Sequence, residues 1–141
     1  MQYEQFIRRV QERANLDTRQ RAEQVTQATL ATFGERIYRT EREQLAAQLP
    51  DALKKYLFER QEPQPTTPQH TERYVLEEFY NRVGARTGSG IQEAAHLAKI
   101  VVGVLAEAVS PGQMQQVMSK LPDEYGDLLR PDQEGTGFPS L

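Results

Sequence analysis

The chain has 141 residues, of which 38% are hydrophobic and 26% are charged, and its formal net charge is −3. This length predicts one domain, and the balance of apolar and charged residues is typical of a folded globular protein rather than a disordered one. The absence of cysteine from the sequence excludes a disulfide framework, thiol catalysis and cysteine-ligated zinc.

The charge is distributed unevenly along the chain. Residues 1–60 carry 11 Lys and Arg against 9 Asp and Glu, a net charge of +2, whereas residues 61–141 carry 6 against 11, a net charge of −5. A surplus of two positive charges is too small to form the basic surface that binds phosphates, so we expect no nucleic-acid partner. The first nine residues contain no uninterrupted apolar stretch, so they do not read as a signal peptide and we expect a cytoplasmic protein.

The first part of the chain predicts two amphipathic helices. Apolar residues recur at helical spacing over residues 3–14 and again over the longer stretch 17–38. We expect Asp17 to cap the second helix. The apolar stripe of that helix includes Val25, and its solvent-facing side includes Thr26.

A short motif closes this helical unit and returns later in the chain. Leu49-Pro50-Asp51 recurs as Leu121-Pro122-Asp123, and each copy precedes an apolar segment with a tyrosine, Tyr125 in the second. The residue before a proline avoids the helical region, whereas proline itself is favoured at the start of a helix. The motif therefore predicts a structural corner between two short helices, and its recurrence indicates two copies of one helical unit.

The two copies predict the domain organisation. We expect a first helical repeat over residues 1–58, a proline-rich linker over 59–73, a second repeat over 74–130 and a flexible tail over 131–141. The linker contains three prolines and is typical of an extended connector, with a ligand for a proline-binding domain as the alternative. In the tail, Phe138 is a candidate docking anchor.

The second copy follows the first at a nearly constant spacing along the chain. In the opening helix Phe79 corresponds to Phe6, and the spacing becomes shorter by one position after the next turn, where Ser89 corresponds to Asp17. Gly84, Gly88 and Gly90 lie around this turn. Because a helix rather than a strand precedes them, we interpret them as turn residues and not as a cradle for phosphate.

The helix expected over residues 92–109 is apolar on almost every face. Lys99 and Glu107 bound the apolar run, so it is too short to cross a membrane and we expect no membrane contact. In the arrangement that we favour, this is the central helix, because a small domain needs such a core. In the alternative, one of its faces is an oligomer or partner surface. Met114 and Met118, on the next helix, are expected to fill the core.

The sequence contains no recognisable set of catalytic, cofactor-binding or metal-ligating residues. Its two histidines are His70 in the linker and His96. His96 has no second histidine or carboxylate three or four residues further on to complete a metal pair, so we expect no metal and no cofactor. If a small ligand binds between the repeats, Arg86, His96 and Lys99 are the polar residues that would line its pocket.

The doubled pattern resembles the bacterial DUF2267 family over residues 3–130. It is carried by Phe-x-x-x-Val helices, by a long second helix and by a Leu-Pro-x-x-Tyr-x-x-Leu ending that runs from Leu121 through Tyr125 to Leu128. The first copy departs from this ending, because Leu53 stands where Tyr125 stands in the second. The resemblance implies a tandem-repeat, all-helical fold, and it brings no established activity and no catalytic residues.

Together these features predict an all-α fold, a helical bundle of two tandem repeats with three to four helices each. We expect the repeats to be related by a pseudo-two-fold axis and to share one core. The expected function is a non-enzymatic binding or adaptor module that acts through protein–protein contacts, with a protein partner or a second copy of the chain. The alternative is a small-ligand sensor or enzyme with a pocket between the repeats, at Arg86, His96 and Lys99.

Overall fold

The structure is a computed structural model that describes residues 1–59 and 75–130. Within these ranges the chain is all-helical and has no strand. Its elements, in chain order, are α1 (Tyr3–Arg13), α2 (Arg19–Arg36), α3 (Arg39–Ala46), α4 (Asp51–Phe58), α5 (Leu76–Thr87), α6 (Ile91–Ala108), α7 (Pro111–Ser119) and a final 3₁₀ helix, η2 (Asp123–Leu129). The predicted linker after Glu59 and the predicted tail, with His70 and Phe138, lie outside the described residues.

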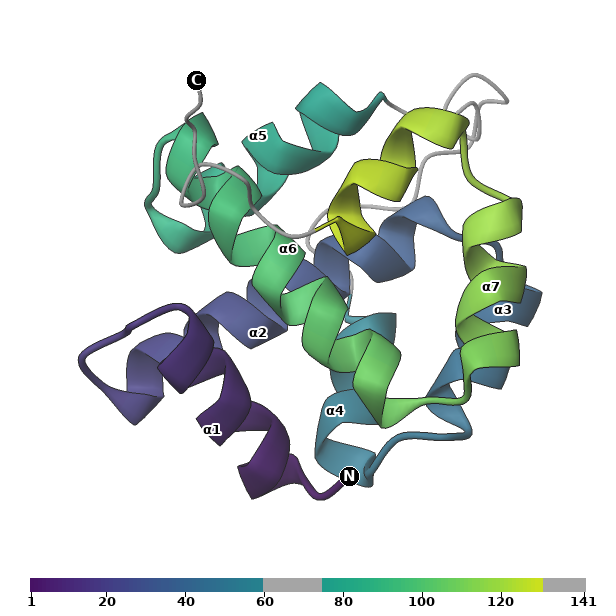
Figure 1. Cartoon of the computed structure of the whole chain (residues 1–141), viewed down its shortest axis with the longest axis horizontal. Coiled ribbons are helices and arrows are strands. Elements are labelled where there is room, and N and C mark those ends of the chain that lie inside the picture. The colour runs from purple at the N-terminus through teal and green to yellow at the C-terminus, as the bar shows by residue number, and fades with distance from the viewer. Residues whose placement is uncertain (60–74, 131–141) are drawn as a thin grey trace.

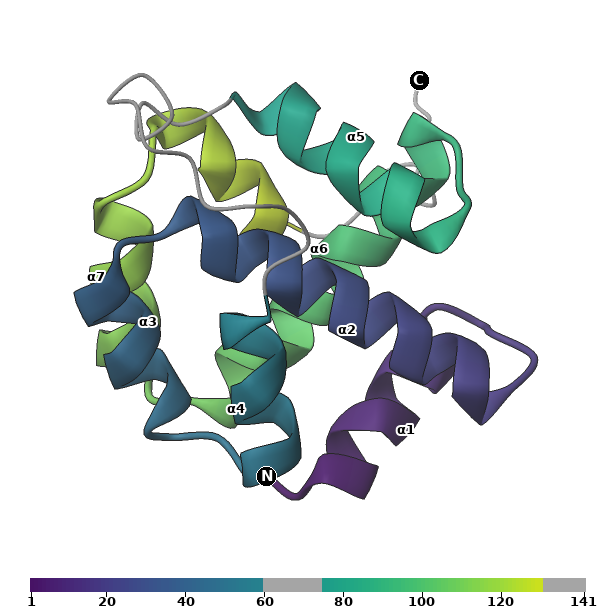
Figure 2. The same ribbon diagram turned by 180° about the vertical axis from the view of Figure 1, so that it is seen from behind.

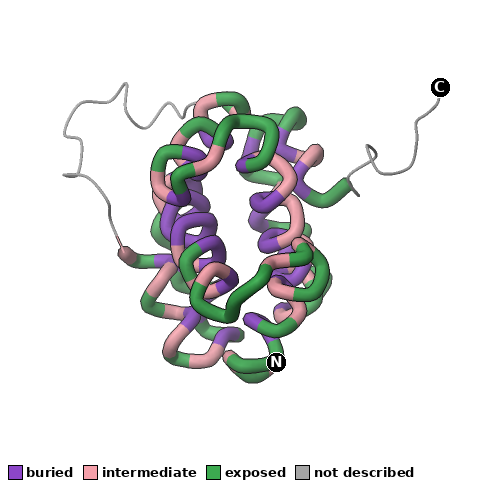
Figure 3. Tube along the Cα trace, turned by 90° about the vertical axis from the view of Figure 1, so that its left-hand side faces the viewer, coloured by how far each residue is buried: buried purple, intermediate pink, exposed green. Residues whose placement is uncertain are grey.

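The two longest helices, α2 and α6, cross at the centre of the molecule (Figures 1 and 2). Each has 18 residues. Helix α2 contacts α1, α4, α5 and α6, while α6 contacts α1, α2, α5, α7 and η2. In Figure 3 the buried positions face the centre of the molecule from both sides. The shorter helices therefore surround a pair of long helices.

One hydrophobic core joins the first and second halves of the chain. Its buried members form a single cluster that draws on every described helix, including Phe6, Leu30, Leu53, Leu97 and Val117. At the centre, Phe79 meets Phe33 edge-on with ring centroids 6.4 Å apart, and it meets Tyr125 at 5.9 Å. Such aromatic pairs stabilise a core beyond the area that they bury. The two halves therefore share one core.

Helix α6 lies inside the bundle as a central helix, which is the arrangement that we favoured from the sequence. Its buried residues point to several neighbours: Ala94, Leu97, Ala98, Val101, Val102, Val104 and Leu105. A helix that is apolar on most of its faces is stable only when other elements cover it. In the described parts of the chain, no helix combines the length and the apolar character that crossing a membrane requires.

Helix α2 is more buried than its sequence pattern suggests. The expectation that Thr26 faces solvent was wrong, because Thr26, Thr29 and Thr32 are all fully buried. The Thr32 hydroxyl donates a hydrogen bond to the Ala28 carbonyl oxygen at 2.7 Å, while the hydroxyls of Thr26 and Thr29 have no hydrogen-bond partner among the described residues. Neighbours on several sides of α2 cover positions that a single apolar stripe leaves exposed.

Two of the described helices, α2 and α7, begin with a side-chain cap, and one of these caps differs from the sequence prediction. Thr18, and not Asp17 as predicted, caps α2, and its hydroxyl accepts a hydrogen bond from the Arg21 backbone N–H at 3.0 Å. Ser110 caps α7 in the same way, and Pro111 occupies the first turn. Both hydroxyls bond backbone N–H groups that lack a partner inside the helix.

The repeated Leu-Pro-Asp motif lies at two turns between helices. Leu49 and Pro50 separate α3 from α4, which begins at Asp51, and Leu121 and Pro122 separate α7 from η2, which begins at Asp123. Both prolines have extended backbone angles, and both leucines are buried in the core. Tyr125 is fully buried, and its hydroxyl accepts a hydrogen bond from Arg36 Nε at 2.9 Å.

Candidate functional site

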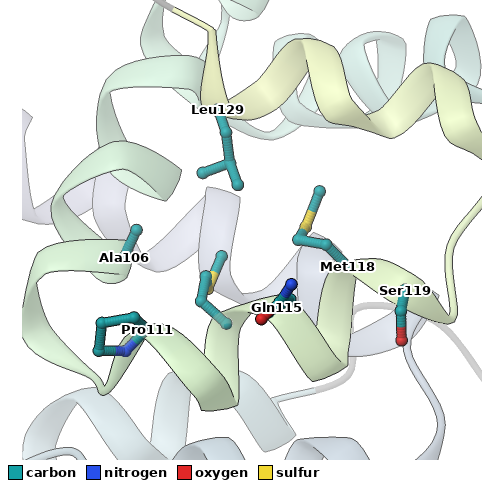
Figure 4. A pocket seen from close by; sticks show the side chains of 7 residues that line it. Ala106, Pro111, Gln115, Met118, Ser119 and Leu129 are labelled. Atoms are coloured by element: carbon teal, nitrogen blue, oxygen red, sulfur yellow. The ribbon is translucent and has the colours of Figure 1, made fainter.

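An apolar groove lies where α7 passes the end of α6 and the end of η2 (Figure 4). Its volume is about 560 Å³, and its walls are almost entirely apolar. Met114 is a buried part of the wall, whereas Leu129 is 41% exposed. The residues that line this α7–η2 groove are Ala106, Pro111, Met114, Gln115, Met118, Ser119 and Leu129.

The wall that α7 contributes carries no charge. Among the helices that the structure describes, α7 is the one without Asp, Glu, Lys or Arg. Its exposed polar side chains at the groove are the Gln115 amide and the Ser119 hydroxyl. Charged residues make up 26% of the whole chain, so this face differs from the rest of the surface. Depletion of charge together with methionine is typical of the central part of a protein interface.

The corresponding place in the first half is closed by backbone packing. When the two halves of the sequence are aligned on Leu49 and Leu121, Gly34 corresponds to Ala106 and Leu57 to Leu129. A Cβ atom on Gly34 would lie only 2.0 Å from the Leu57 carbonyl oxygen, so α4 rests directly on the α2 backbone. Ala106 carries the methyl group that Gly34 lacks. An equally close approach of η2 to α6 at this point is therefore sterically excluded.

A side chain completes the closure of the first half. Arg42 corresponds to Met114 in the same alignment. Arg42 is buried, and its Nη1 donates a hydrogen bond to the Gly34 carbonyl oxygen at 2.6 Å. Its guanidinium lies 5.6 Å from the centre of the Phe58 ring, within the range of a cation–π contact. Met114 makes no such polar bridge, and the space beside it is the α7–η2 groove.

Helix α7 is held in place by α3, which runs beside it in the opposite direction. At one end, the Ser110 backbone N–H donates to Gln48 Oε1 at 2.7 Å. At the other end, Lys120 Nζ lies 3.1 Å from Glu41 Oε2, and the Glu41 side chain is only 4% exposed. The α7 wall of the groove is therefore anchored near both ends of the helix.

Two clusters of ion pairs connect the halves of the chain. Arg9 and Arg13 of α1 lie 2.8 Å and 2.9 Å from Glu107 of α6. Arg82 and Arg86 of α5 lie 3.6 Å and 3.1 Å from Glu35 of α2. Along the sequence, Arg82 and Arg86 follow Arg9 and Arg13 by 73 residues, and Glu107 follows Glu35 by 72 residues. The two clusters are thus built from residues at corresponding positions.

The two clusters differ in their exposure to water. The Glu107 side chain is 42% exposed, whereas those of Glu35 and Arg86 are 11% and 13% exposed. The pKa of the Glu107 carboxyl is lowered, and the hydrogen bond from Arg13 is the largest cause. Burial, the second-largest cause, raises the pKa, whereas the positive charge of Arg13 lowers it further. Because water screens exposed charges, the cluster at Glu35 is expected to contribute more to stability.

The three residues proposed for a pocket between the repeats face different neighbours. Arg86 Nη1 donates to the Thr32 hydroxyl at 2.7 Å in addition to its contact with Glu35. Lys99 Nζ lies 3.5 Å from Asp127 Oδ2 of η2, and His96 is half-buried on α6. None of the three lines the α7–η2 groove, and their convergence on one ligand stays a prediction.

The groove was not identified from the sequence. Met114 and Met118 were expected to fill the core, and Met114 does so, but Met118 is only partly buried and lines the groove. The available signal was the uncharged stretch Pro111–Ser119 in a chain rich in charge. Among the described residues there is no group of three or more His, Cys, Asp or Glu side chains that could hold a metal ion.

Comparison with known proteins identifies a family. The family model described as "Uncharacterized conserved protein (DUF2267)" matches residues 3–128. No curated protein matches the chain.

Proposed function

The chain belongs to the DUF2267 family, and we propose that it is a non-enzymatic binding module that holds an apolar segment of a partner protein in the α7–η2 groove. The observation that carries the proposal is a groove of about 560 Å³ with apolar walls beside a helix without charged residues. Burial of such walls by a partner is favourable in proportion to the apolar area removed from water.

The chemistry of the lining supports binding rather than catalysis at this groove. Its heteroatom-bearing side chains are two thioethers, one amide and one hydroxyl, from Met114, Met118, Gln115 and Ser119. None of these groups titrates near neutral pH, so the lining supplies no general acid or base. Methionine side chains are flexible and polarisable, and they suit a surface that adapts to a partner.

We also infer that the two halves are tandem repeats related by a pseudo-two-fold axis. The helices recur in the same order with lengths of 11, 18, 8 and 8 residues and then 12, 18, 9 and 7 residues. The contact of α1 with α6 has its counterpart in that of α5 with α2. In the same way, Glu107 of α6 pairs with an arginine of α1, and Glu35 of α2 pairs with an arginine of α5. On this view, binding is a property that the second repeat has and the first repeat has lost or never had.

Protein capture from the native host tests the proposal. The full chain and its Met118→Glu variant serve as bait, because a charge in the apolar wall is costly to bury. Gln115→Glu and Gln116→Glu form an isosteric pair on the exposed surface of α7, of which Gln115 alone lines the groove. We expect one partner to be retained by the wild type and by Gln116→Glu, and to be lost with Met118→Glu and weakened with Gln115→Glu. Equal capture of that partner by all four folded proteins would contradict a binding function for the groove.

The alternative of a small-ligand sensor or enzyme has less support. Glu35 and Asp127 already lie beside two of the three residues that it requires, Arg86 and Lys99. A ligand between the halves would have to compete with these carboxylates. We therefore keep the proposal of a protein-binding module, and we propose a cytoplasmic location, with which the lack of cysteine is compatible.

A further inference from the structure

We propose that the α7–η2 groove takes a short amphipathic helix whose contact face is apolar and uncharged, contributed by a partner protein. The inference rests on the proposed function and specifies the occupant of the same site. It follows from the size of the groove, from its wall chemistry and from the elements around it.

The size of the groove favours a short segment over a second copy of the chain. Seven residues line it, whereas a stable protein–protein interface uses about 20 to 30 residues on each side. A dimer built on this groove alone would bury too little surface to persist. A peptide-sized segment needs only a small apolar pocket and a few anchoring side chains.

The elements around the groove select the helical mode of peptide recognition. An extended peptide that adds a strand needs an exposed sheet edge, and the described residues contain no strand. A polyproline segment docks on grooves lined by aromatic rings, and the lining of this groove contains no aromatic residue. An amphipathic helix in an apolar groove remains as the mode that fits the walls.

The dimensions and the chemistry of α7 define the contact face of the partner. The nine residues of α7 span about 13 Å at 1.5 Å per residue, which matches between two and three turns of a helix. Apolar anchors at positions i, i+3 or i+4, and i+7 would therefore lie along the groove. A charged group on that face would lose its hydration without finding a counter-charge on α7, so the partner's charges must lie on its other faces.

A displayed library of short random peptides, each long enough for four helical turns, tests the inference without a known partner. The library is selected on the full-length wild type, and each winner is measured against Met118→Glu and against the control Gln116→Glu. We expect winners with apolar residues at helical spacing, a binding loss of roughly tenfold or more with Met118→Glu, and no loss with Gln116→Glu. A central proline in a winning peptide should weaken binding by a similar factor, because proline breaks the helix.

The methionine methyl groups report where the peptide binds. The chain has three methionines, and two of them, Met114 and Met118, line the groove, while Met1 packs elsewhere against the core. In spectra of ¹³C-methyl methionine, we expect a winning peptide to shift Met118 and leave Met1 unchanged. Winners with alternating, extended patterns, equal binding to Met118→Glu, or a library without any winner would overturn the inference.

Other occupants give distinct results in the same spectra. A Met118 signal that depends on protein concentration without peptide would assign the groove to a second copy of the chain and overturn the proposal. A Met118 signal that moves in the Phe138→Ala variant without peptide would assign it to the chain's own C-terminal segment, with the same consequence. If a native partner is lost with Met118→Glu but binds through a non-helical segment, the binding function stands and the helical inference fails.

Discussion

The α3–α4 segment and the α7–η2 segment contain short elements in the same order, yet they fill the space beside their long helices differently. In the first, α4 lies against the backbone of Gly34, and Arg42 bonds the carbonyl oxygen of the same residue. In the second, Ala106 and Met114 stand at these positions and a groove is open. Two differences in side-chain size and charge thus accompany the change from a closed site in the first half to an open groove in the second.

The ion pairs between the halves show a second difference of the same kind. Glu35 meets its arginines in a largely buried place, whereas Glu107 meets its own where water reaches them. Both clusters pair arginines with one glutamate, but water screens the charges at Glu107 more than those at Glu35. The cluster at Glu35 should therefore contribute more to stability.

The strongest effect should come from separating the halves. Residues 1–60 and 71–130, made as two polypeptides, should each be poorly ordered, because Phe33 and Phe79 belong to one shared core. On mixing, helix content should rise, as measured by circular dichroism. Two isolated halves that each melt cooperatively would show that the core is divisible.

The next strongest effect is expected at the close approach of α4 to α2. Gly34→Ala should destabilise the fold by about 3 kcal/mol, because the new Cβ would collide with the Leu57 backbone. The matched change Ala106→Gly should cost only about 1 kcal/mol, the usual penalty of glycine within a helix. Urea unfolding of both variants measures the difference, and equal values would mean that this contact does not close the first half.

The two glutamates should respond to neutralisation by different amounts. Glu35→Gln removes the carboxylate from a largely buried site beside Arg86 and should cost about 2 kcal/mol, less than a fully buried pair. Glu107→Gln acts at an exposed site and should cost less than about 1 kcal/mol. Thermal unfolding at low salt and at high salt provides the measurement, and a larger effect for Glu107→Gln would reverse the expected order of the two clusters.

The weakest effect should be the acid dependence of the exposed cluster. The hydrogen bond from Arg13 lowers the pKa of Glu107 in the folded state, so its contribution to stability is present above the pKa of the unfolded chain. That contribution is lost as the pH falls through the lower, folded pKa. The stability difference between the wild type and Glu107→Gln should therefore shrink on acidification. A difference that stays constant down to pH 3 would contradict this ionic origin.

The helical class, the approximate helix positions and the family could all be predicted from the sequence. These features depend on the spacing of apolar residues along one segment and on local chemistry such as the Leu49-Pro50 and Leu121-Pro122 turns. Both are properties of neighbours in the chain, so they can be predicted without knowledge of which helices meet. The correction from Asp17 to Thr18 at the start of α2 reflects the usual uncertainty of one residue at a helix end.

What lies between the helices could be learned only from their packing in three dimensions. Periodicity describes one helix as if it had a single buried face, and it therefore missed the burial of Thr26 on a helix covered from several sides. It also did not anticipate that Lys99 meets Asp127, or that Met118 lines a groove. Each of these depends on how segments that are far apart in the chain pack against one another, which the periodicity of a single segment does not describe.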